Sequence, residues 1–266
     1  MSSDLSPEDL RRIAVEVAER AARYLSEAWC SELTQSVKGD TIRADLEADR
    51  LIREAIRARL GRFTVVSEES GLTGQGGYVF VVDPLDGSLN YEHCVRWSSV
   101  SVAVAPPEST RLSDVVAGAV APLWGETLSF AKGYGCYEGD KRVTPRRGES
   151  RLIYTYVESV SDAIKVARVF NAIPGAKVRS LGSAALEIAL VGLGRGLAYV
   201  DLRGKLRNVD AAAAIAFARE CGARAVDDKG VDLDVPITGV LPLGNVVVAI
   251  DKLDVILKAI TSAGSP

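Results

Sequence analysis

Residues 79–91 read VFVVDPLDGSLNY, and the interpretation of the whole chain depends on this stretch. A valine-rich run typical of a buried strand ends at Asp83, and Pro84 stiffens the chain between Asp83 and Asp86. The two acids therefore stand at a rigid corner at the edge of a sheet. The same residues also suit an ordinary turn, because Asp-Pro and Asp-Gly are common turn dipeptides. Taken alone, the stretch is compatible with a turn and with a site for a charged ligand.

Acids occur at the ends of two other predicted elements. Glu68 and Glu69 come directly after the strand-like run 63–67, and Asp210 stands at the start of an alanine-rich helix. Each has a plain alternative, a solvated loop for the glutamates and a partner of the helix dipole for Asp210. If 63–67 and 78–82 are neighbouring strands, however, their acids converge. Carboxylates about 4 Å apart repel by roughly 4 kcal/mol at an effective dielectric of 20, so such a cluster requires cations or raised pKa values.

The sequence therefore predicts a metal site made of oxygen atoms alone. Its ligands are the carboxylates of four acids and one main-chain carbonyl: Glu68, Asp83, Asp86, Asp210 and the carbonyl of Leu85. Because the set contains no His or Cys, it favours Mg²⁺ over zinc or copper. Two predicted helix starts carry small residues whose main-chain amides can hold a phosphate, Gly87-Ser88 and Gly182-Ser183-Ala184.

Composition excludes several classes of protein. The 266 residues carry a net charge of −3, which provides no basic field for nucleic acid. No apolar stretch approaches the roughly 20 residues that a membrane-spanning helix needs, and the first residues do not resemble a secretion signal, so we expect a cytoplasmic protein without a membrane partner. The four cysteines have no regular spacing, and we expect free thiols rather than a zinc site or a disulfide framework: Cys30, Cys94, Cys136 and Cys221.

The pattern of apolar residues divides the chain into two halves. The first half, 1–145, begins with amphipathic helices over 7–28 and 46–60 and carries most of the predicted metal ligands. It continues with β-rich runs that we expect to pair as antiparallel neighbours, at 63–67, 78–82, 98–105, 114–121, 126–131 and 134–139. The polar segment 144–150 is the predicted boundary. In the second half, 146–266, strands at 153–157, 196–202 and 245–250 alternate with helices at 162–170, 183–192, 210–222 and 253–260.

Three motifs, in order along the chain, are similar to those of the inositol monophosphatase family, within the wider group of Mg²⁺-dependent, Li⁺-sensitive sugar phosphatases. They are SEES at 67–70, DPLDGSLNY at 83–91 and NVDAAAAIAFARECGA at 208–223. The segments AKGYGCYEGDKRV at 131–143 and RSLGSAAL at 179–186 extend the resemblance over nearly the whole chain. It implies a fold between α+β and α/β, the layered αβαβα sandwich of these phosphatases, and a homodimer.

The resemblance also implies roles for individual residues. Glu68, Asp83 and the Leu85 carbonyl would hold one Mg²⁺, and Asp83, Asp86 and Asp210 a second, with Glu68 close to a third, weakly bound ion. Ser88, where the family usually has Thr, would act with Asp45 to orient and deprotonate a metal-bound water for in-line attack on phosphorus. The catalytic residues are thus Asp45, Glu68 and Ser88. The implied substrate contacts are Asp86, Gly87, Ser88, Gly182, Ser183, Ala184, Asp201 and Asp210.

Two departures from the family pattern are visible. Val209 replaces the usual Trp, a mild change that leaves the ligands intact. The stretch DLRGKLRNVD at 201–210 is longer and more basic than in animal enzymes, and it resembles archaeal and bacterial relatives that hydrolyse both inositol phosphate and fructose 1,6-bisphosphate. Arg179 and Arg203 are therefore predicted to bind the distal phosphate, with ordinary surface arginines as the plain alternative.

The predicted function is a Mg²⁺-dependent phosphatase of inositol 1-phosphate and of fructose 1,6-bisphosphate. An alternative within the superfamily is a 3′-phosphoadenosine 5′-phosphate phosphatase, which needs a pocket for adenine rather than additional arginines. An alternative of another class is an inactive relative that serves as a regulatory or scaffolding subunit. Such relatives usually lack a metal ligand, and none of the four predicted carboxylates is missing from this chain.

Overall fold

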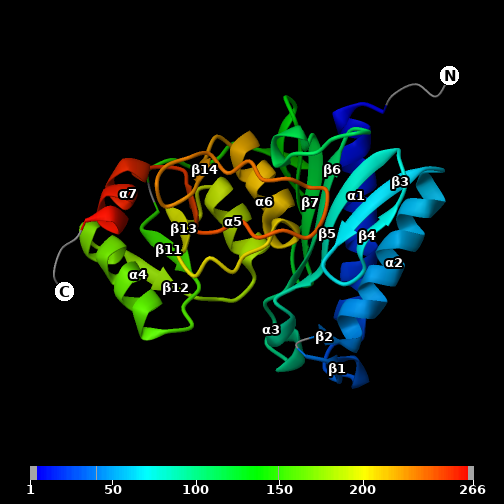
Figure 1. Ribbon diagram of the computed structural model, residues 1–266, viewed down its shortest axis with the longest axis horizontal. Helices are drawn as coiled ribbons and strands as arrows, with labels where there is room; N and C mark the ends of the chain where they lie inside the picture. Colours follow the sequence, from blue (N-terminus) through cyan, green and yellow to red (C-terminus); the bar gives the residue numbers. More distant parts are fainter. Residues whose placement is uncertain (1–4, 40, 149, 263–266) are drawn as a thin grey trace.

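The computed structural model describes residues 5–39, 41–148 and 150–262, and it contains two large sheets (Figure 1). In spatial order, the strands of the larger sheet are β10 (Lys141–Val143), β9 (Gly135–Glu138), β8 (Leu128–Ala131), β7 (Ala117–Pro122), β6 (Ser99–Ala105), β5 (Tyr78–Asp86), β3 (Phe63–Ser67) and β4 (Gly71–Gly74). Those of the smaller sheet are β12 (Lys177–Arg179), β11 (Leu152–Thr155), β13 (Ala198–Asp201), β15 (Val246–Ala249) and β14 (Arg224–Val226). A separate ribbon consists of β1 (Ser36–Lys38) and β2 (Thr41–Ile42).

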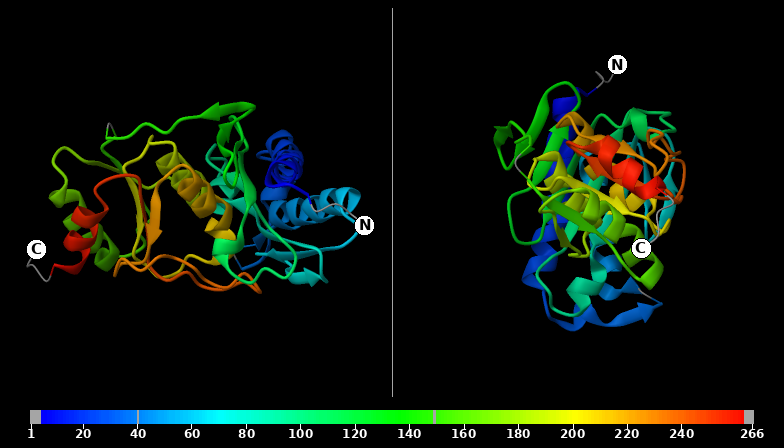
Figure 2. Two further views of the ribbon diagram at one scale, coloured as in Figure 1. Left: turned by 90° about the horizontal axis from the view of Figure 1, so that it is seen from above. Right: turned by 90° about the vertical axis from the view of Figure 1, so that its left-hand side faces the viewer.

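Helices form three layers around these sheets (Figure 2). The helices α1 (Pro7–Glu27) and α2 (Arg43–Arg59) cover one face of the larger sheet, and α5 (Ala184–Gly192) and α6 (Asn208–Glu220) lie between the two sheets. On the outer face of the smaller sheet lie α4 (Val160–Ala172) and α7 (Leu253–Thr261). The short helix α3 (Ser88–Glu92) follows β5, and two 3₁₀ turns span Glu32–Thr34 and Leu112–Asp114. The predicted αβαβα sandwich is confirmed. None of the described helices is long and apolar enough to cross a membrane.

The central strands are buried on both faces. Along β5, Phe80 and Val82 belong to the core beneath α1 and α2, whereas Val79 and Val81 belong to the core shared with α5 and α6. A strand covered on both sides has no solvent-facing positions, so its sequence is a continuous apolar run rather than an alternating one. The valine-rich stretch that precedes Asp83 is explained by this position in the middle layer.

Most predicted helices and strands are confirmed, with bounds that differ by a few residues. The helix α1 begins with Pro7 behind Ser6, whose hydroxyl accepts the Asp9 amide at 3.2 Å. Six strands were not predicted, β1, β2, β4, β10, β12 and β14, because runs of two to four residues are too short to show a period. The chain passes from the larger to the smaller sheet through the segment 144–150, of which Glu149 lies outside the described residues. The division into halves at residue 145 stays a prediction.

The prediction that the β-rich runs pair as antiparallel neighbours is wrong for one pair. β3 and β5 run parallel, with Ser67 opposite Val82. The reason is β4, which turns back along the outer edge of β3, so that the chain returns to begin β5 in the same direction as β3. Parallel neighbours end at the same edge of a sheet. The acids that follow β3 and those that end β5 therefore emerge side by side.

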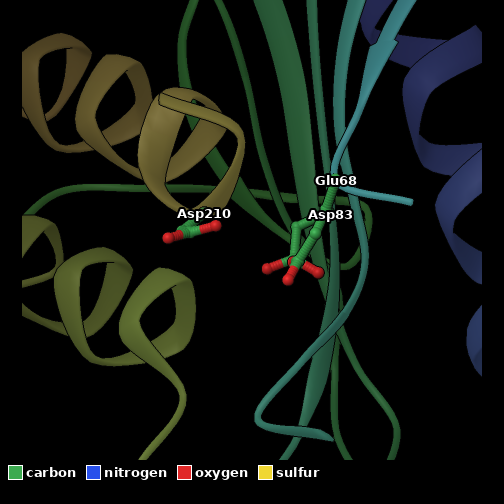
Figure 3. Close-up of side chains that lie close together, drawn as sticks. All are labelled: Glu68, Asp83 and Asp210. Atoms are coloured by element: carbon green, nitrogen blue, oxygen red, sulfur yellow. The ribbon is translucent and has the colours of Figure 1, made fainter. Parts of the chain in front are cut away.

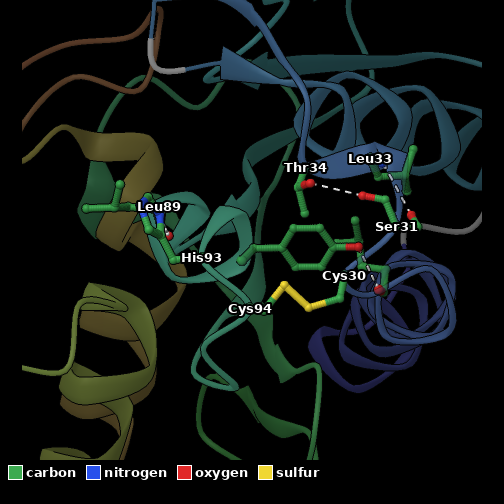
Figure 4. The surroundings of a disulfide bond; sticks show 9 residues. Cys30, Ser31, Leu33, Thr34, Leu89, His93 and Cys94 are labelled. Atoms are coloured by element: carbon green, nitrogen blue, oxygen red, sulfur yellow. Dashed lines mark hydrogen bonds between the residues drawn. A yellow bond between two sulfur atoms is a disulfide. The ribbon is translucent and has the colours of Figure 1, made fainter.

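The prediction of free thiols is also wrong. Disulfide bonds join Cys30 to Cys94 and Cys136 to Cys221, and no free cysteine remains. The partners are 64 and 85 residues apart in the sequence, so only the folded chain brings them together. The first bond ties the segment after α1 to the loop after α3 (Figure 4), and the second ties β9 to the residue that follows α6.

Loss of the first disulfide should destabilise the protein. In the chain-entropy model, a crosslink that closes a loop of about 64 residues stabilises the folded state by about 4 kcal/mol. We expect the double variant Cys30→Ser/Cys94→Ser to lose roughly 3–4 kcal/mol, which corresponds to a Tm lower by about 10 °C for a chain of this length. Scanning calorimetry of variant and wild type measures the difference. An unchanged Tm would show that this bond does not form or does not constrain the unfolded chain.

Candidate functional site

Three carboxylates from three different elements face one another where β3 and β5 end (Figure 3). Glu68 follows β3 directly, Asp83 lies within β5, and Asp210 is the third residue of α6. One oxygen atom of each lies within 4.8 Å of the oxygen atoms of the other two. Asp83 is only 3% exposed, whereas Glu68 and Asp210 are half-buried. The structure thus brings together three of the residues that the sequence analysis singled out.

A bulge in β5 turns two acids to the same side of the sheet. Asp83 lies opposite Ser101 of β6, and Asp86 lies opposite Ser99, so a step of three residues in β5 matches a step of two in β6. Because residues two apart in a strand share a face, Ser99 and Ser101 point the same way, and so do the two acids opposite them. A regular strand would have turned Asp83 and Asp86 to opposite faces. Pro84 lies inside the bulge, where a missing N–H donor is tolerated.

Asp86 is nevertheless not a member of the group of three. Its carboxylate accepts four hydrogen bonds, from the amides of Ala184 and Ala185 at 2.9 Å each, from the Ser99 hydroxyl at 3.2 Å and from the Ser183 hydroxyl. Asp86 therefore sits at the N-terminus of α5, where the helix dipole favours a negative charge. If Asp86 also binds a metal ion, as predicted, its carboxylate must bind the ion and accept these hydrogen bonds at the same time. The predicted phosphate cradle at this helix start has its Ala184 amide engaged by Asp86.

Burial and mutual repulsion raise the pKa values of these acids. The pKa of Asp83 is well above its ordinary value, because the carboxyl is buried and faces Glu68, Asp86 and Asp210. Burial raises the pKa of Asp86 to about 7, although its hydrogen bond from a serine hydroxyl opposes the shift. Burial likewise raises the pKa of Asp210 to about 6, against the lowering effect of a nearby arginine. A cation placed among these carboxylates would relieve the repulsion.

The donor set fits a hard divalent cation. All three grouped ligands are carboxylates, and the buried Oδ1 of Asp210 accepts no hydrogen bond from any residue that the structure describes. Mg²⁺ prefers oxygen ligands of this kind. Leu85, whose carbonyl is a further predicted ligand, lies in the bulge, and its amide donates to Asp83 Oδ1 at 3.0 Å. This hydrogen bond fixes the orientation of the Asp83 carboxylate.

One residue of the site was missed by the sequence analysis. Arg207, the residue before α6, donates a hydrogen bond from Nη2 to Glu68 Oε1. The same nitrogen lies 3.1 Å from Asp210 Oδ1, close enough for an ion pair although not aligned for a hydrogen bond. A signal was present, because Arg207 stands one helical turn before Asp210 in the basic stretch 201–210. From that stretch, only Arg203 was predicted to have a role, as a contact of the distal phosphate.

The two predicted phosphate cradles lie against each other. Gly87, at the start of α3, has a left-handed φ of 87°, and a Cβ atom there would lie 3.0 Å from the Trp97 carbonyl oxygen and 3.1 Å from that of Gly182. Asn90 Nδ2 donates to the Leu181 carbonyl at 2.7 Å and to the Trp97 carbonyl at 2.8 Å. These bonds fasten α3 to the segment before α5. So close an approach requires glycine at position 87.

Asp45, in the first turn of α2, lies close enough to Glu68 and Glu69 to be affected by their charges. Its Oδ2 accepts the Ile42 amide at 2.7 Å. Burial raises the pKa of Asp45 to about 8, and the charges of Glu69 and Glu68 contribute. The strand β2, which ends at Ile42, contacts α3, whose first residue is the predicted partner Ser88. A carboxyl group that changes protonation near neutral pH is suited to proton transfer.

The residues predicted to contact a distal phosphate lie outside the carboxylate group. Arg203 has a side chain only 9% exposed; it donates from Nε and Nη2 to the buried Asp201 at 3.0 and 2.6 Å, pairs with Glu158 and stacks 4.0 Å above the Tyr156 ring. Its guanidinium is therefore occupied by internal partners. Arg179 is exposed on the edge strand β12, where its Nη1 donates to the neighbouring Val178 carbonyl at 2.9 Å.

Comparison with known proteins gives matches over nearly the whole chain. The sequence model of the inositol monophosphatase family matches residues 6–258. The inositol-1-monophosphatase of Aeropyrum pernix is 40% identical over 257 residues, which cover 93% of this chain and 95% of that protein. The fructose-1,6-bisphosphatase/inositol-1-monophosphatase of Thermococcus kodakarensis is 30% identical over 233 residues, 84% of each chain. A solved structure from Pyrococcus horikoshii, of a protein described as having similarities to inositol-1 monophosphatase, matches with a TM-score of 0.81 at 26% identity, over 97% of this chain and all of that one.

Proposed function

Because the chain belongs to the inositol monophosphatase family, we propose that it is a Mg²⁺-dependent phosphatase that hydrolyses inositol 1-phosphate and fructose 1,6-bisphosphate. The observation that carries the proposal is the group of three carboxylates, Glu68, Asp83 and Asp210, which face one another from three elements. The names of the relatives support the choice of substrates, since one is called an inositol-1-monophosphatase and another carries both names.

In this proposal the acidic residues hold the ion and the substrate phosphate together. Glu68, Asp83 and Asp210 supply carboxylate ligands, with the Leu85 carbonyl beside them. When bound, Mg²⁺ would neutralise phosphate charge and make water a better nucleophile at neutral pH. Asp86 holds the N-terminus of α5 in place through the Ala184 and Ala185 amides, so that this helix start faces the same site. We expect two or three ions per site, a number that metal titration measures.

Asp45 and Ser88 are proposed to manage the proton of the attacking water. Burial raises the pKa of Asp45 to about 8, so the carboxyl can accept a proton and release it again near neutral pH. Ser88 begins α3, and the left-handed Gly87 before it sets the direction in which that helix starts. Removal of the hydroxyl in Ser88→Ala is therefore expected to affect the rate of hydrolysis more than the binding of substrate.

The proposal is tested by a substrate panel. Purified protein is incubated with Mg²⁺ and equal concentrations of inositol 1-phosphate, fructose 1,6-bisphosphate and adenosine 3′,5′-bisphosphate, and released phosphate is measured. We expect phosphate from the first two, loss of activity with excess chelator, and inhibition by Li⁺. Hydrolysis of the adenine nucleotide alone would overturn the choice of substrates. No turnover of any of them, from protein that still binds Mg²⁺, would favour a regulatory or scaffolding relative.

We also propose that the chain forms a homodimer, as the family resemblance implies. Light scattering coupled to size exclusion measures the mass in solution. A mass near twice the 28.3 kDa of one chain is expected, and a mass of one chain at working concentration would contradict the proposal.

A further inference from the structure

Arg207 places a permanent positive charge inside the carboxylate group. Its main-chain amide donates to Asp210 Oδ2 at 2.8 Å, and its side chain then folds back over the same carboxylate. Nη2 reaches Glu68 Oε1 by a short hydrogen bond and lies 3.1 Å from Asp210 Oδ1. One guanidinium therefore bridges two of the three grouped acids. These acids come from opposite sides of the site, Glu68 from the larger sheet and Asp210 from α6.

No other basic side chain makes such a contact among the described ion pairs. Arg203, in the same basic stretch, is held by Asp201 and Glu158 instead. Asp83 has no ion-pair partner in the described part of the chain, and its carboxyl is buried. Among the ion pairs of the described residues, Arg207 is thus the cation that offsets the charge of Glu68 and Asp210, and Asp83 is left for an external ion.

The atoms that Arg207 contacts are the ones that a metal ion would use. Nη2 lies 3.1 Å from Asp210 Oδ1, a buried oxygen atom that accepts no hydrogen bond from the described residues, and it also bonds Glu68 Oε1; Mg²⁺ binds such carboxylate oxygen atoms at about 2.1 Å. A guanidinium nitrogen at hydrogen-bond distance from the same oxygen atoms occupies that space, and two cations so close repel each other. The side chain of Arg207 is 39% exposed, so its guanidinium can turn toward solvent when a metal ion takes its place beside the carboxylates.

We propose that Arg207 is a resident cation of the metal site: it bridges Glu68 and Asp210 in the metal-free protein and must leave at least one of them when Mg²⁺ binds. The inference rests on the proposed function, because it assumes that these carboxylates bind Mg²⁺. It has two consequences. The metal-free site is held together by the arginine, and Mg²⁺ binds less tightly than it would to the same carboxylates without it.

The test measures Mg²⁺ binding without substrate. In Arg207→Gln the permanent charge is removed, so we expect calorimetric titration to show Mg²⁺ binding about tenfold tighter than in wild type. In the presence of chelator we expect the Tm of the variant to be lower by about 3 °C, because the carboxylates lose their cation. Arg207→Lys keeps the charge but not the planar fork that bridges two acids, and an intermediate affinity is expected. Arg195→Gln is the matched control, since Arg195 also forms a close ion pair, at 2.7 Å from Glu138 outside the site, and its loss should leave Mg²⁺ affinity unchanged.

The outcomes separate this inference from the function on which it rests. If wild-type protein binds no Mg²⁺, the proposed function fails, and the inference with it. If wild type binds Mg²⁺ and Arg207→Gln binds it equally or more weakly, the resident-cation role alone is wrong. Should Arg207→Gln fail to fold, Arg207→Lys decides the matter, because an affinity equal to or below that of wild type would likewise exclude competition.

Discussion

Asp210→Asn is expected to lose turnover by a factor on the order of 10³ or more while the protein stays folded. The substitution replaces one carboxylate of the group of three by a neutral amide of the same shape, and this removes the charge that a divalent ion requires. The folded state should not suffer, because the carbonyl oxygen of asparagine can still accept the Arg207 amide that Asp210 Oδ2 accepts at 2.8 Å. Relief of repulsion with Asp83 and Glu68 also favours the variant in its metal-free form.

Asp162→Asn is a matched control for this experiment. Asp162 is likewise the third residue of its helix, α4, and its carboxylate accepts hydrogen bonds from the Glu158 amide and the Ser159 hydroxyl, but it lies in the outer layer away from the carboxylate group. The same chemical change there should leave turnover intact. Phosphate release and circular dichroism are measured for both variants. More than about a tenth of wild-type activity in Asp210→Asn would contradict the assignment of Asp210 as a metal ligand.

The metal-free protein is expected to become more stable as the pH falls from 8 to 6. Burial raises the pKa values of Asp45 and Glu187 to about 8 and that of Asp86 to about 7, and the pKa of Asp83 is also raised. An acid whose pKa is higher in the folded than in the unfolded chain binds protons preferentially in the folded state, so stability is lost as the pH rises toward the folded value. If two of these groups change protonation over this range, the gain on acidification is roughly 3 kcal/mol.

Calorimetry at pH 6, 7 and 8 checks this dependence, with chelator and with saturating Mg²⁺. Mg²⁺ should stabilise the protein more at pH 8 than at pH 6, because the ion requires its carboxylates deprotonated. Glu187→Gln supplies a comparison within the chain. Its buried carboxyl accepts the Leu181 amide at 3.0 Å, which the amide oxygen of glutamine can also accept, so the variant should fold and show a shallower pH dependence. A metal-free protein whose Tm rises toward pH 8 would refute the role given to these buried acids.

Those parts of the fold that depend on local pattern could be predicted from the sequence. The spacing of apolar residues predicted the amphipathic helices and the apolar strands. The motifs around Glu68, Asp83 and Asp210 indicated the family and, through it, the layered architecture. What could not be predicted depends on neighbours that are distant in the chain. The parallel pairing of β3 and β5 follows from β4, which has only four residues and no visible period.

In the site, too, the features that could not be predicted depend on residues distant in the chain. That Asp83 and Asp86 share a face depends on the register between β5 and β6, which no residue within 79–91 reveals. That Asp86 holds the start of α5 depends on a contact between positions 98 residues apart. Arg207 reaches Glu68 across 139 positions, and its importance is visible only when both lie in place. The disulfides were missed for the same reason, since irregular spacing carries no information on which cysteines meet.

The origin of the three carboxylates in separate elements has a consequence for the lifetime of the folded protein. Glu68 and Asp83 are in place once the larger sheet forms, but Asp210 arrives only when α6 docks between the two sheets. A chain still on its way to the native state therefore offers an incomplete set of ligands. An ion that binds only the finished arrangement cannot hasten its assembly, but it must be released before the layers separate. Bound Mg²⁺ should accordingly slow unfolding, which lengthens the half-life of the folded protein, and leave the rate of folding nearly unchanged.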